Sequence, residues 1–109
     1  MLNDNYQLRY LPLFYEDVKD VVMYIKYELS NPQAAGDFID AVEQAILQRL
    51  PNCEGFEPYH SKRERRYPYY RIYVKNYVIY YVVIDDVADC KIMEVRRCLY
   101  KRRDMENEI

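Results

Sequence analysis

The chain has 109 residues, of which 50% are hydrophobic and 31% charged, and its formal net charge is −2. This length suits one compact core, so we expect residues 1–109 to form a single domain. With only two glycines and mixed charges, the composition excludes collagen-like and disordered proteins, and the lack of a long apolar run excludes a membrane-spanning helix. The first ten residues lack the apolar block of a secretion signal, which predicts a cytoplasmic protein.

A short strand and a helix are predicted at the start of the chain. Residues 6–11 resemble a strand, and Pro12 ends it because proline cannot donate a hydrogen bond within a sheet. Apolar side chains then recur every three or four positions from Phe14 to Leu29, with charged residues between them. This spacing predicts an amphipathic helix over residues 13–29.

A second helix follows after a tight connection. Asn31 is suited to cap this helix, Pro32 to occupy its first position, and Pro51 to end it. The two helices are therefore expected to form a hairpin. Residues 51–68, called the basic loop below, show no periodicity, and loops of this length often carry function.

The second half of the chain predicts three strands. Lys75-Asn76 forms the first turn, where asparagine tolerates a positive φ, and residues 85–89 form the second. The strands cover residues 69–74, 77–84 and 91–99.

These elements predict an α+β fold in the order β-α-α-β-β-β, with the helical hairpin packed on one face of a mainly antiparallel four-stranded sheet. The middle strand of the second half is apolar throughout, as expected for a central strand. Its neighbours alternate, so the face away from the hairpin should present Arg71, Tyr73, Glu94 and Arg96.

Residues that commonly bind metals or carry catalysis are few. The three cysteines, Cys53, Cys90 and Cys98, contain no Cys-x-x-Cys pair, and we expect buried reduced thiols. His60 is the only histidine, and it has no partner at ligand spacing. It could serve as an acid or base, or simply be solvated. We expect no metal and no cofactor.

Charge and tyrosine are unevenly distributed. Residues 1–57 carry ten acidic and four basic side chains, whereas residues 58–103 carry twelve basic and five acidic ones. Fourteen residues are tyrosine, and half of them lie between Tyr67 and Tyr81. A basic, tyrosine-rich surface suits an anionic partner, but solvated charges and ordinary strand packing would explain the same pattern.

Three strings, together with the order of elements, carry a resemblance to a known superfamily. They begin at Asn31 (NPQAA), at Tyr70 (YRIYVKNYVIYY) and at Val95 (VRRCLYKRRD). The chain resembles the RelE/ParE superfamily of toxins from bacterial type II toxin-antitoxin systems. The resemblance implies a growth inhibitor that is neutralised by a cognate antitoxin, whose flexible segment wraps the toxin and is expected to cover the tyrosine-rich groove.

Two activities are implied by the resemblance. RelE-like members are metal-independent endoribonucleases that cut messenger RNA on the ribosome, and the matching catalytic residues here would be Arg71, Arg97 and Tyr100. Val78, however, stands where the ribonucleases carry an arginine on the third strand. ParE-like members inhibit DNA gyrase without a catalytic group, and this activity is slightly favoured. A non-toxic protein-interaction module of the same fold remains the third possibility.

Further basic and aromatic residues are expected to bind the target or the antitoxin. An acidic antitoxin segment would pair with the basic loop and make the interaction sensitive to salt. The predicted partners are the antitoxin and either gyrase or the ribosome with its message, and no membrane. The predicted binding residues are Lys62, Arg63, Arg65, Arg66, Tyr73, Arg96, Arg102 and Arg103.

Overall fold

The computed structural model describes residues 6–60, 65–85, 90–103 and 105–108. It shows four strands and three α-helices, with a π-helical turn after the first helix and a short 3-10 turn after the second. In chain order the elements are β1 (Tyr6–Tyr10), α1 (Pro12–Met23), the π-helical turn (Tyr24–Glu28), α2 (Pro32–Arg49), the 3-10 turn (Leu50–Asn52), β2 (Tyr70–Val74), β3 (Tyr77–Ile84), β4 (Lys91–Tyr100) and α3 (Met105–Glu108).

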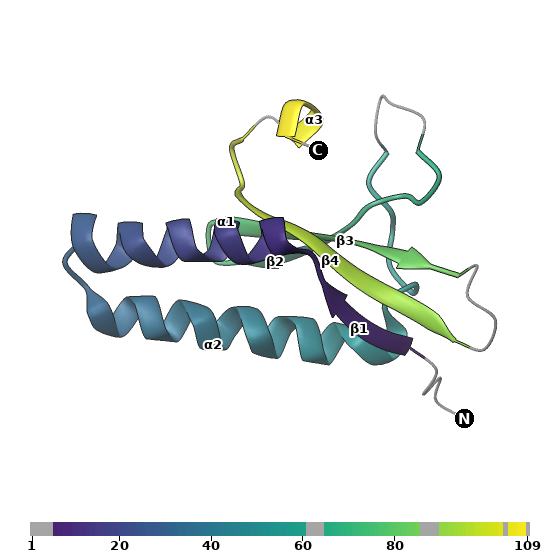
Figure 1. The fold of residues 1–109 in the computed structure, drawn as a ribbon, viewed down its shortest axis with the longest axis horizontal. Helices are drawn as coiled ribbons and strands as arrows, with labels where there is room; N and C mark the ends of the chain where they lie inside the picture. Colours follow the sequence, from purple (N-terminus) through teal and green to yellow (C-terminus); the bar gives the residue numbers. More distant parts are fainter. Residues whose placement is uncertain (1–5, 61–64, 86–89, 104, 109) are drawn as a thin grey trace.

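The strands form one mixed sheet in the order β1-β4-β3-β2. β1 runs parallel to β4, and the other two pairings are antiparallel. Figure 1 shows α1 and α2 side by side on one face of the sheet, with α3 on the other. The predicted α+β fold and its element order are confirmed. None of the described helices is long and apolar enough to cross a membrane.

The helical hairpin begins as predicted. Proline occupies the start of both helices, and the Asn31 side chain accepts a hydrogen bond from the Ala34 N–H at 3.1 Å. The end of the first helix differs from the prediction, because Leu29 donates to the Tyr24 carbonyl and opens a π-helical turn. Ser30, with a φ of 50°, then reverses the chain.

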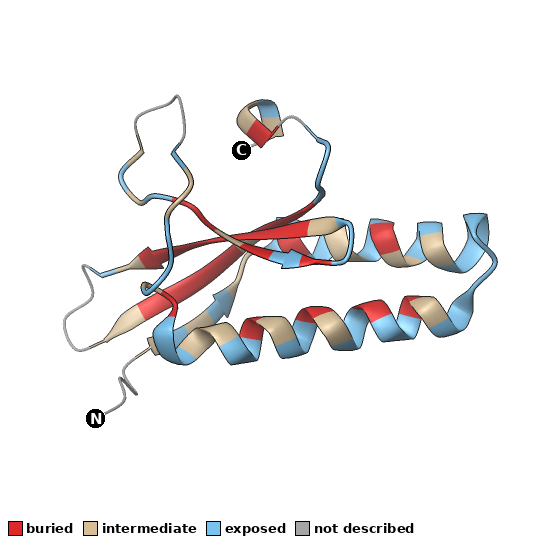
Figure 2. Cartoon of the chain, turned by 180° about the vertical axis from the view of Figure 1, so that it is seen from behind, coloured by how far each residue is buried: buried red, intermediate tan, exposed pale blue. Residues whose placement is uncertain are grey.

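The main core lies between the hairpin and the sheet (Figure 2). Its central side chain is Tyr81, whose hydroxyl donates to the Cys53 carbonyl at 2.6 Å and accepts from Arg49 at 2.9 Å. Burial raises the pKa of Tyr81 to about 12, although the Arg49 guanidinium opposes the shift. These bonds fasten the beginning of the basic loop to the core. The most buried members of the core are Phe38, Ile46, Ile79, Tyr81, Met93, Val95 and Cys53.

The cysteines and the first turn require two corrections. Cys53 and Cys98 are buried free thiols, as predicted, whereas Cys90 is only partly buried. In the turn between β2 and β3 the positive φ belongs to Lys75, at 54°, and not to Asn76. In the part of the chain that the structure describes, no cluster of three or more metal-ligating side chains is found.

Candidate functional site on the distal face of the sheet

The sheet face away from the helical hairpin, called the distal face below, is organised by a bulge in β4. Tyr80 pairs with Arg97 and Tyr81 pairs with Val95, so Arg96 is an extra residue without a partner on β3. A bulge of this kind breaks the alternation of side chains along a strand. Because of it, two consecutive arginines can reach partners on the distal side of β4.

A row of three side chains crosses the distal face. Arg71 of β2 pairs with Tyr80 of β3, which in turn pairs with Arg97 of β4. Neighbouring strands lie about 4.8 Å apart, so the two arginines start roughly 10 Å from each other. The structure therefore brings together two of the three residues predicted for catalysis.

Arg97 is fully engaged by other parts of the chain. Its Nε and Nη2 donate to the two carboxylate oxygens of Asp17 at 2.7 and 3.0 Å, and its Nη1 donates to the Glu108 carbonyl at 2.8 Å. The Asp17 carboxylate raises the pKa of Arg97, although burial opposes this shift. Every nitrogen of the guanidinium thus donates to a protein partner, and its charge is paired with Asp17 rather than open to a phosphate.

Asp17 also explains how the edge of β4 is closed. The β1 pairing ends at Val95, and beyond it the Cys98 N–H donates to Asp17 at 2.9 Å. The carboxylate therefore occupies the edge of the sheet where a strand is missing. The Asp17 and Arg97 side chains are each 11% exposed, so the pair is shielded from water.

Glu94 and Arg96 form a second ion-pair group on the distal face. Glu94 accepts from Arg96 at 2.7 Å and from the Nε of Arg9 at 2.9 Å, while Arg96 also reaches the Tyr69 hydroxyl at 3.4 Å. Burial alone would raise the pKa of Glu94, but the bonds from the two arginines outweigh it and lower the pKa. Arg96, one of the predicted binding residues, is thus an internal counterion.

Arg71 is available in a way that Arg97 and Arg96 are not. Its guanidinium lies over the rings of Tyr59 and Tyr73, 5.1 and 6.0 Å from their centroids. Within the described residues the guanidinium makes no hydrogen bond or ion pair, so its N–H groups are free to donate to a ligand. Tyr73 beside it is 64% exposed. An accessible arginine between tyrosine rings is suited to anions, to rings and to protein carboxylates.

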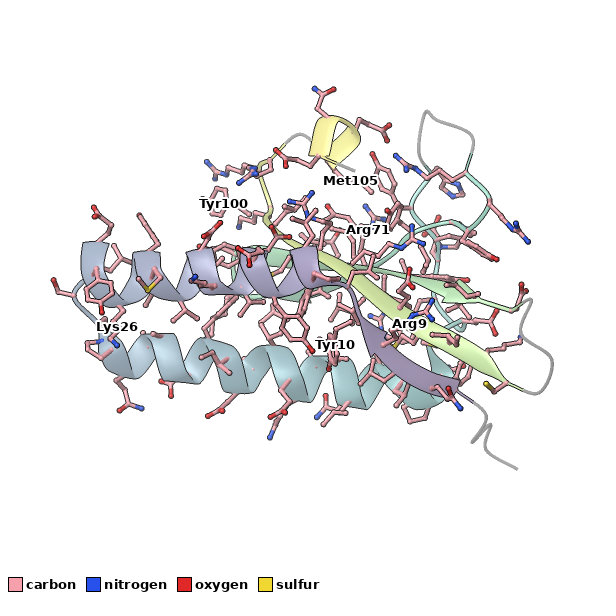
Figure 3. All side chains as sticks on the ribbon, viewed as in Figure 1. Arg9, Tyr10, Lys26, Arg71, Tyr100 and Met105 are labelled. Carbon is pink, nitrogen blue, oxygen red and sulfur yellow. The ribbon has the colours of Figure 1, made fainter. Side chains whose placement is uncertain are left out.

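Tyr100 lies apart from the arginine row. It pairs with Tyr77 at the end of β4, and their ring centroids are 5.7 Å apart. Tyr77 packs against Phe38 in the core beneath the hairpin, so Tyr100 belongs to the opposite side of the sheet from Arg71. Figure 3 shows Tyr100 toward the hairpin and well separated from Arg71.

The other predicted binding residues are scattered. Lys62 and Arg63 lie outside the described residues. The Arg65 and Arg66 guanidinium groups lie over the Tyr69 and Tyr67 rings, at 5.1 and 5.3 Å.

Arg102 and Arg103 are exposed beyond β4, and Arg103 pairs with Glu108 at 3.0 Å. His60 is exposed and lies 3.5 Å from Glu57. The binding roles of the scattered residues therefore stay predictions.

Part of the distal face is covered. A second apolar cluster lies there, and Met105 of α3 is buried in it with only 6% of its surface exposed (Figure 3). From the sequence we did not predict that α3 packs over part of this face, which was expected to present Arg71, Tyr73, Glu94 and Arg96. The cluster consists of Tyr69, Val78, Tyr80, Val82, Leu99 and Met105.

A separate groove lies between the two long helices. It has a volume of about 460 Å³ and apolar walls, and Tyr15 and Ile39 at its rim are 58% and 44% exposed. Exposed apolar side chains around a groove are typical of protein-binding surfaces. The sequence reasoning assigned the hairpin only to the core and missed this outer surface.

Comparison with known proteins identifies the family. A search of curated proteins found no match to the chain. The family model described as the ParE toxin of the type II toxin-antitoxin system, parDE, matches residues 8–105. The match covers the hairpin, β2, β3, β4, most of β1 and the start of α3, and it agrees with the element order seen here. The chain belongs to the ParE toxin family of type II toxin-antitoxin systems.

Proposed function

We propose that this toxin arrests bacterial growth by binding DNA gyrase in the cytoplasm, without catalysing a reaction. Membership of the ParE family supports a toxin with an antitoxin partner. The observation that carries the choice of mechanism is the state of Arg97. Its charge is already paired with the shielded Asp17 carboxylate, and each of its three nitrogens donates to Asp17 or Glu108, so the late arginine that a ribonuclease needs is not free to neutralise a phosphate.

Two further positions support a binding mechanism. Val78 is 3% exposed and aliphatic, so it supplies no cation at the place where ribonucleases of the superfamily carry an arginine. Tyr100 belongs to the other side of the sheet from Arg71, so it cannot act as a proton donor at a phosphate held by Arg71. Phosphodiester cleavage requires these groups to converge on one reacting site.

Binding requires only an accessible surface, and Arg71 with Tyr73 provides one. Arginine and tyrosine are the side chains that most often dominate the energetics of protein interfaces. The antitoxin would bind a different surface of the toxin, the groove between α1 and α2, where an amphipathic helix of the antitoxin could bury apolar side chains.

Ribonuclease activity is the second candidate, and Arg71 is the observation that favours it. Its unpaired guanidinium stands in one row with Tyr80 and Arg97 and could hold a phosphate. Release of Arg97 from Asp17 would be needed before the row could act as a catalytic group.

Induced expression in a bacterial host separates these activities. Gyrase inhibition predicts growth arrest with DNA damage and relaxed plasmid DNA, while messenger RNA persists at its normal level. Rapid loss of messenger RNA before any change in plasmid topology would contradict the proposal and favour the ribonuclease. Absence of arrest, with protein accumulation verified, would contradict both activities.

A further inference from the structure

The C-terminal turn α3 is attached to the distal face by one apolar side chain. Met105 is buried among side chains from β3, β4 and the segment before β2. α3 is only four residues long and has no other buried residue. Among the described residues of this segment, Met105 alone supplies an apolar attachment.

Charged and polar contacts add to the attachment of α3. Glu108 pairs with Arg103 at 3.0 Å and lies 3.7 Å from Arg97, whose Nη1 also donates to its carbonyl. Glu106 accepts a hydrogen bond from the Tyr59 hydroxyl at 2.9 Å. Tyr59 in turn stacks on Arg71. The turn thus bridges the distal face from Arg97 to the side chains around Arg71.

The surface beneath α3 has the composition of a peptide-binding site. Without Met105, the apolar side chains of Val78, Tyr80 and Leu99 would be open to water. Cationic side chains border this strip, and Arg97 and Arg103 would lose their contacts with Glu108. An apolar strip with a charged rim is typical of an interaction surface, and here the rim is positive.

We propose that α3 is an autoinhibitory strap: it occupies, within the same chain, a surface that binds an acidic segment with an apolar anchor on the protein that the toxin acts on. The strap shows the chemistry that fits, because its own sequence from Asp104 to Ile109 has three acids and a methionine. This inference rests on the proposed function, since it names the partner chemistry and the regulation of the same face.

The strap competes effectively because it is covalently attached. A tethered segment acts at an effective concentration near the millimolar range, so even a weak contact keeps the surface filled. The apparent affinity for an external segment is then the intrinsic affinity multiplied by the fraction of molecules in which the strap is released. Weakening the strap should therefore strengthen binding of the partner.

A labelled peptide tests the surface without gyrase. The probe is a fluorescein-labelled peptide of residues 104–109, and the protein is the full chain with Met105→Ala and Glu108→Gln. A matched variant, Met23→Ala with Glu28→Gln, changes the same residue types at the exposed end of the hairpin. Circular dichroism and thermal unfolding check that each variant is folded, and Glu108→Gln alone serves as a milder version.

Fluorescence anisotropy should show at least about tenfold tighter binding to the strap variant than to the wild-type chain or the matched variant. A probe in which serine replaces the methionine should bind at least tenfold more weakly. Equal binding to wild-type and strap variant, no binding to either, or binding independent of the methionine would overturn the proposal. Tighter binding of a single-stranded oligonucleotide than of the peptide would overturn the assignment to a protein segment.

The role of the target is measured separately. If the acidic segment belongs to gyrase, the strap variant should inhibit gyrase supercoiling at about tenfold lower concentration than the wild type. Equal inhibition by the two proteins would refute the link between strap and target while leaving the proposed function intact. If neither protein inhibits gyrase although the peptide still binds the strap variant, the proposed function is refuted, while the peptide-binding surface beneath α3 is supported.

Discussion

Replacement of Asp17 by alanine tests the view that Arg97 is structural. The carboxylate receives three hydrogen bonds, two from Arg97 and one from the Cys98 N–H. Removing one partner of a shielded ion pair leaves the other charge without compensation and typically costs 3–5 kcal/mol. Because the pair is at the rim of the fold and Arg97 keeps its bond to Glu108, we expect a loss of about 3 kcal/mol in the free energy of unfolding.

This loss converts into a measurable shift of the melting temperature. At about 2.1 cal/mol/K per residue, a chain of 109 residues has an unfolding entropy of about 230 cal/mol/K. A loss of 3 kcal/mol then lowers Tm by about 13 °C. Urea unfolding gives the free energy of unfolding itself. An unchanged m-value would show that the wild type and Asp17→Ala unfold from similar native states.

Asp20→Ala is the matched control, because Asp20 lies on the same helix with an exposed side chain and should cost less than about 0.5 kcal/mol. A double-mutant cycle with Arg97→Met should give a coupling energy of about 2 kcal/mol or more. If Asp17→Ala costs no more than Asp20→Ala, or if the coupling is near zero, Arg97 is not held by Asp17. Arg97 would then be free to act on a phosphate, as ribonuclease activity requires.

Three further predictions concern other parts of the molecule. Iodoacetamide should modify Cys90 in the folded protein much faster than Cys53 and Cys98, since burial raises the pKa of these two thiols to about 11 and about 12; equal rates followed by mass spectrometry would contradict the assigned burial. Because the pKa of Glu94 is lowered in the folded protein, its carboxylate stabilises the fold above the usual value of 4.5, and this stability is lost as the pH falls through the lower folded value. The free energy of unfolding of Glu94→Gln should therefore depend less on pH below about 4.5 than that of the wild type. An unchanged pH profile would refute this. Neutralising the four basic residues of the basic loop should weaken antitoxin binding or toxicity, and unchanged values of both would exclude the loop from either surface.

The secondary structure could be predicted because its signals are local. The spacing of apolar residues, the cap at Asn31 and the prolines at both helix starts each act over a few residues. The π-helical turn after Met23 could not be predicted, since it is only a change of one residue in the hydrogen-bond spacing. The positive φ in the first turn was predicted for Asn76 because asparagine tolerates this conformation well, whereas Lys75 adopts it in the structure.

The candidate site was predictable only in part. Alternation along β2 placed Arg71 and Tyr73 on the correct face, because the period of two is a local property of strands. The partner of Arg97 lies 80 residues away, and nothing in the sequence around Asp17 distinguishes it from other acids of the same helix. The bulge at Arg96 and the burial of Met105 also depend on tertiary packing. One usable signal was the change from a basic block to an acidic end of the chain.

A gyrase titration with an Arg71→Ala, Tyr73→Ala double variant tests the central claim most directly. The matched variant is Lys26→Ala, Tyr27→Ala, which removes another cation and tyrosine in contact, 5.4 Å apart, at the far end of the hairpin (Figure 3). We predict that the wild type and the matched variant inhibit supercoiling equally, and that loss of Arg71 and Tyr73 raises the half-inhibitory concentration at least about tenfold. Equal inhibition by all three proteins, or cleavage of messenger RNA on purified ribosomes by the wild type, would contradict the account.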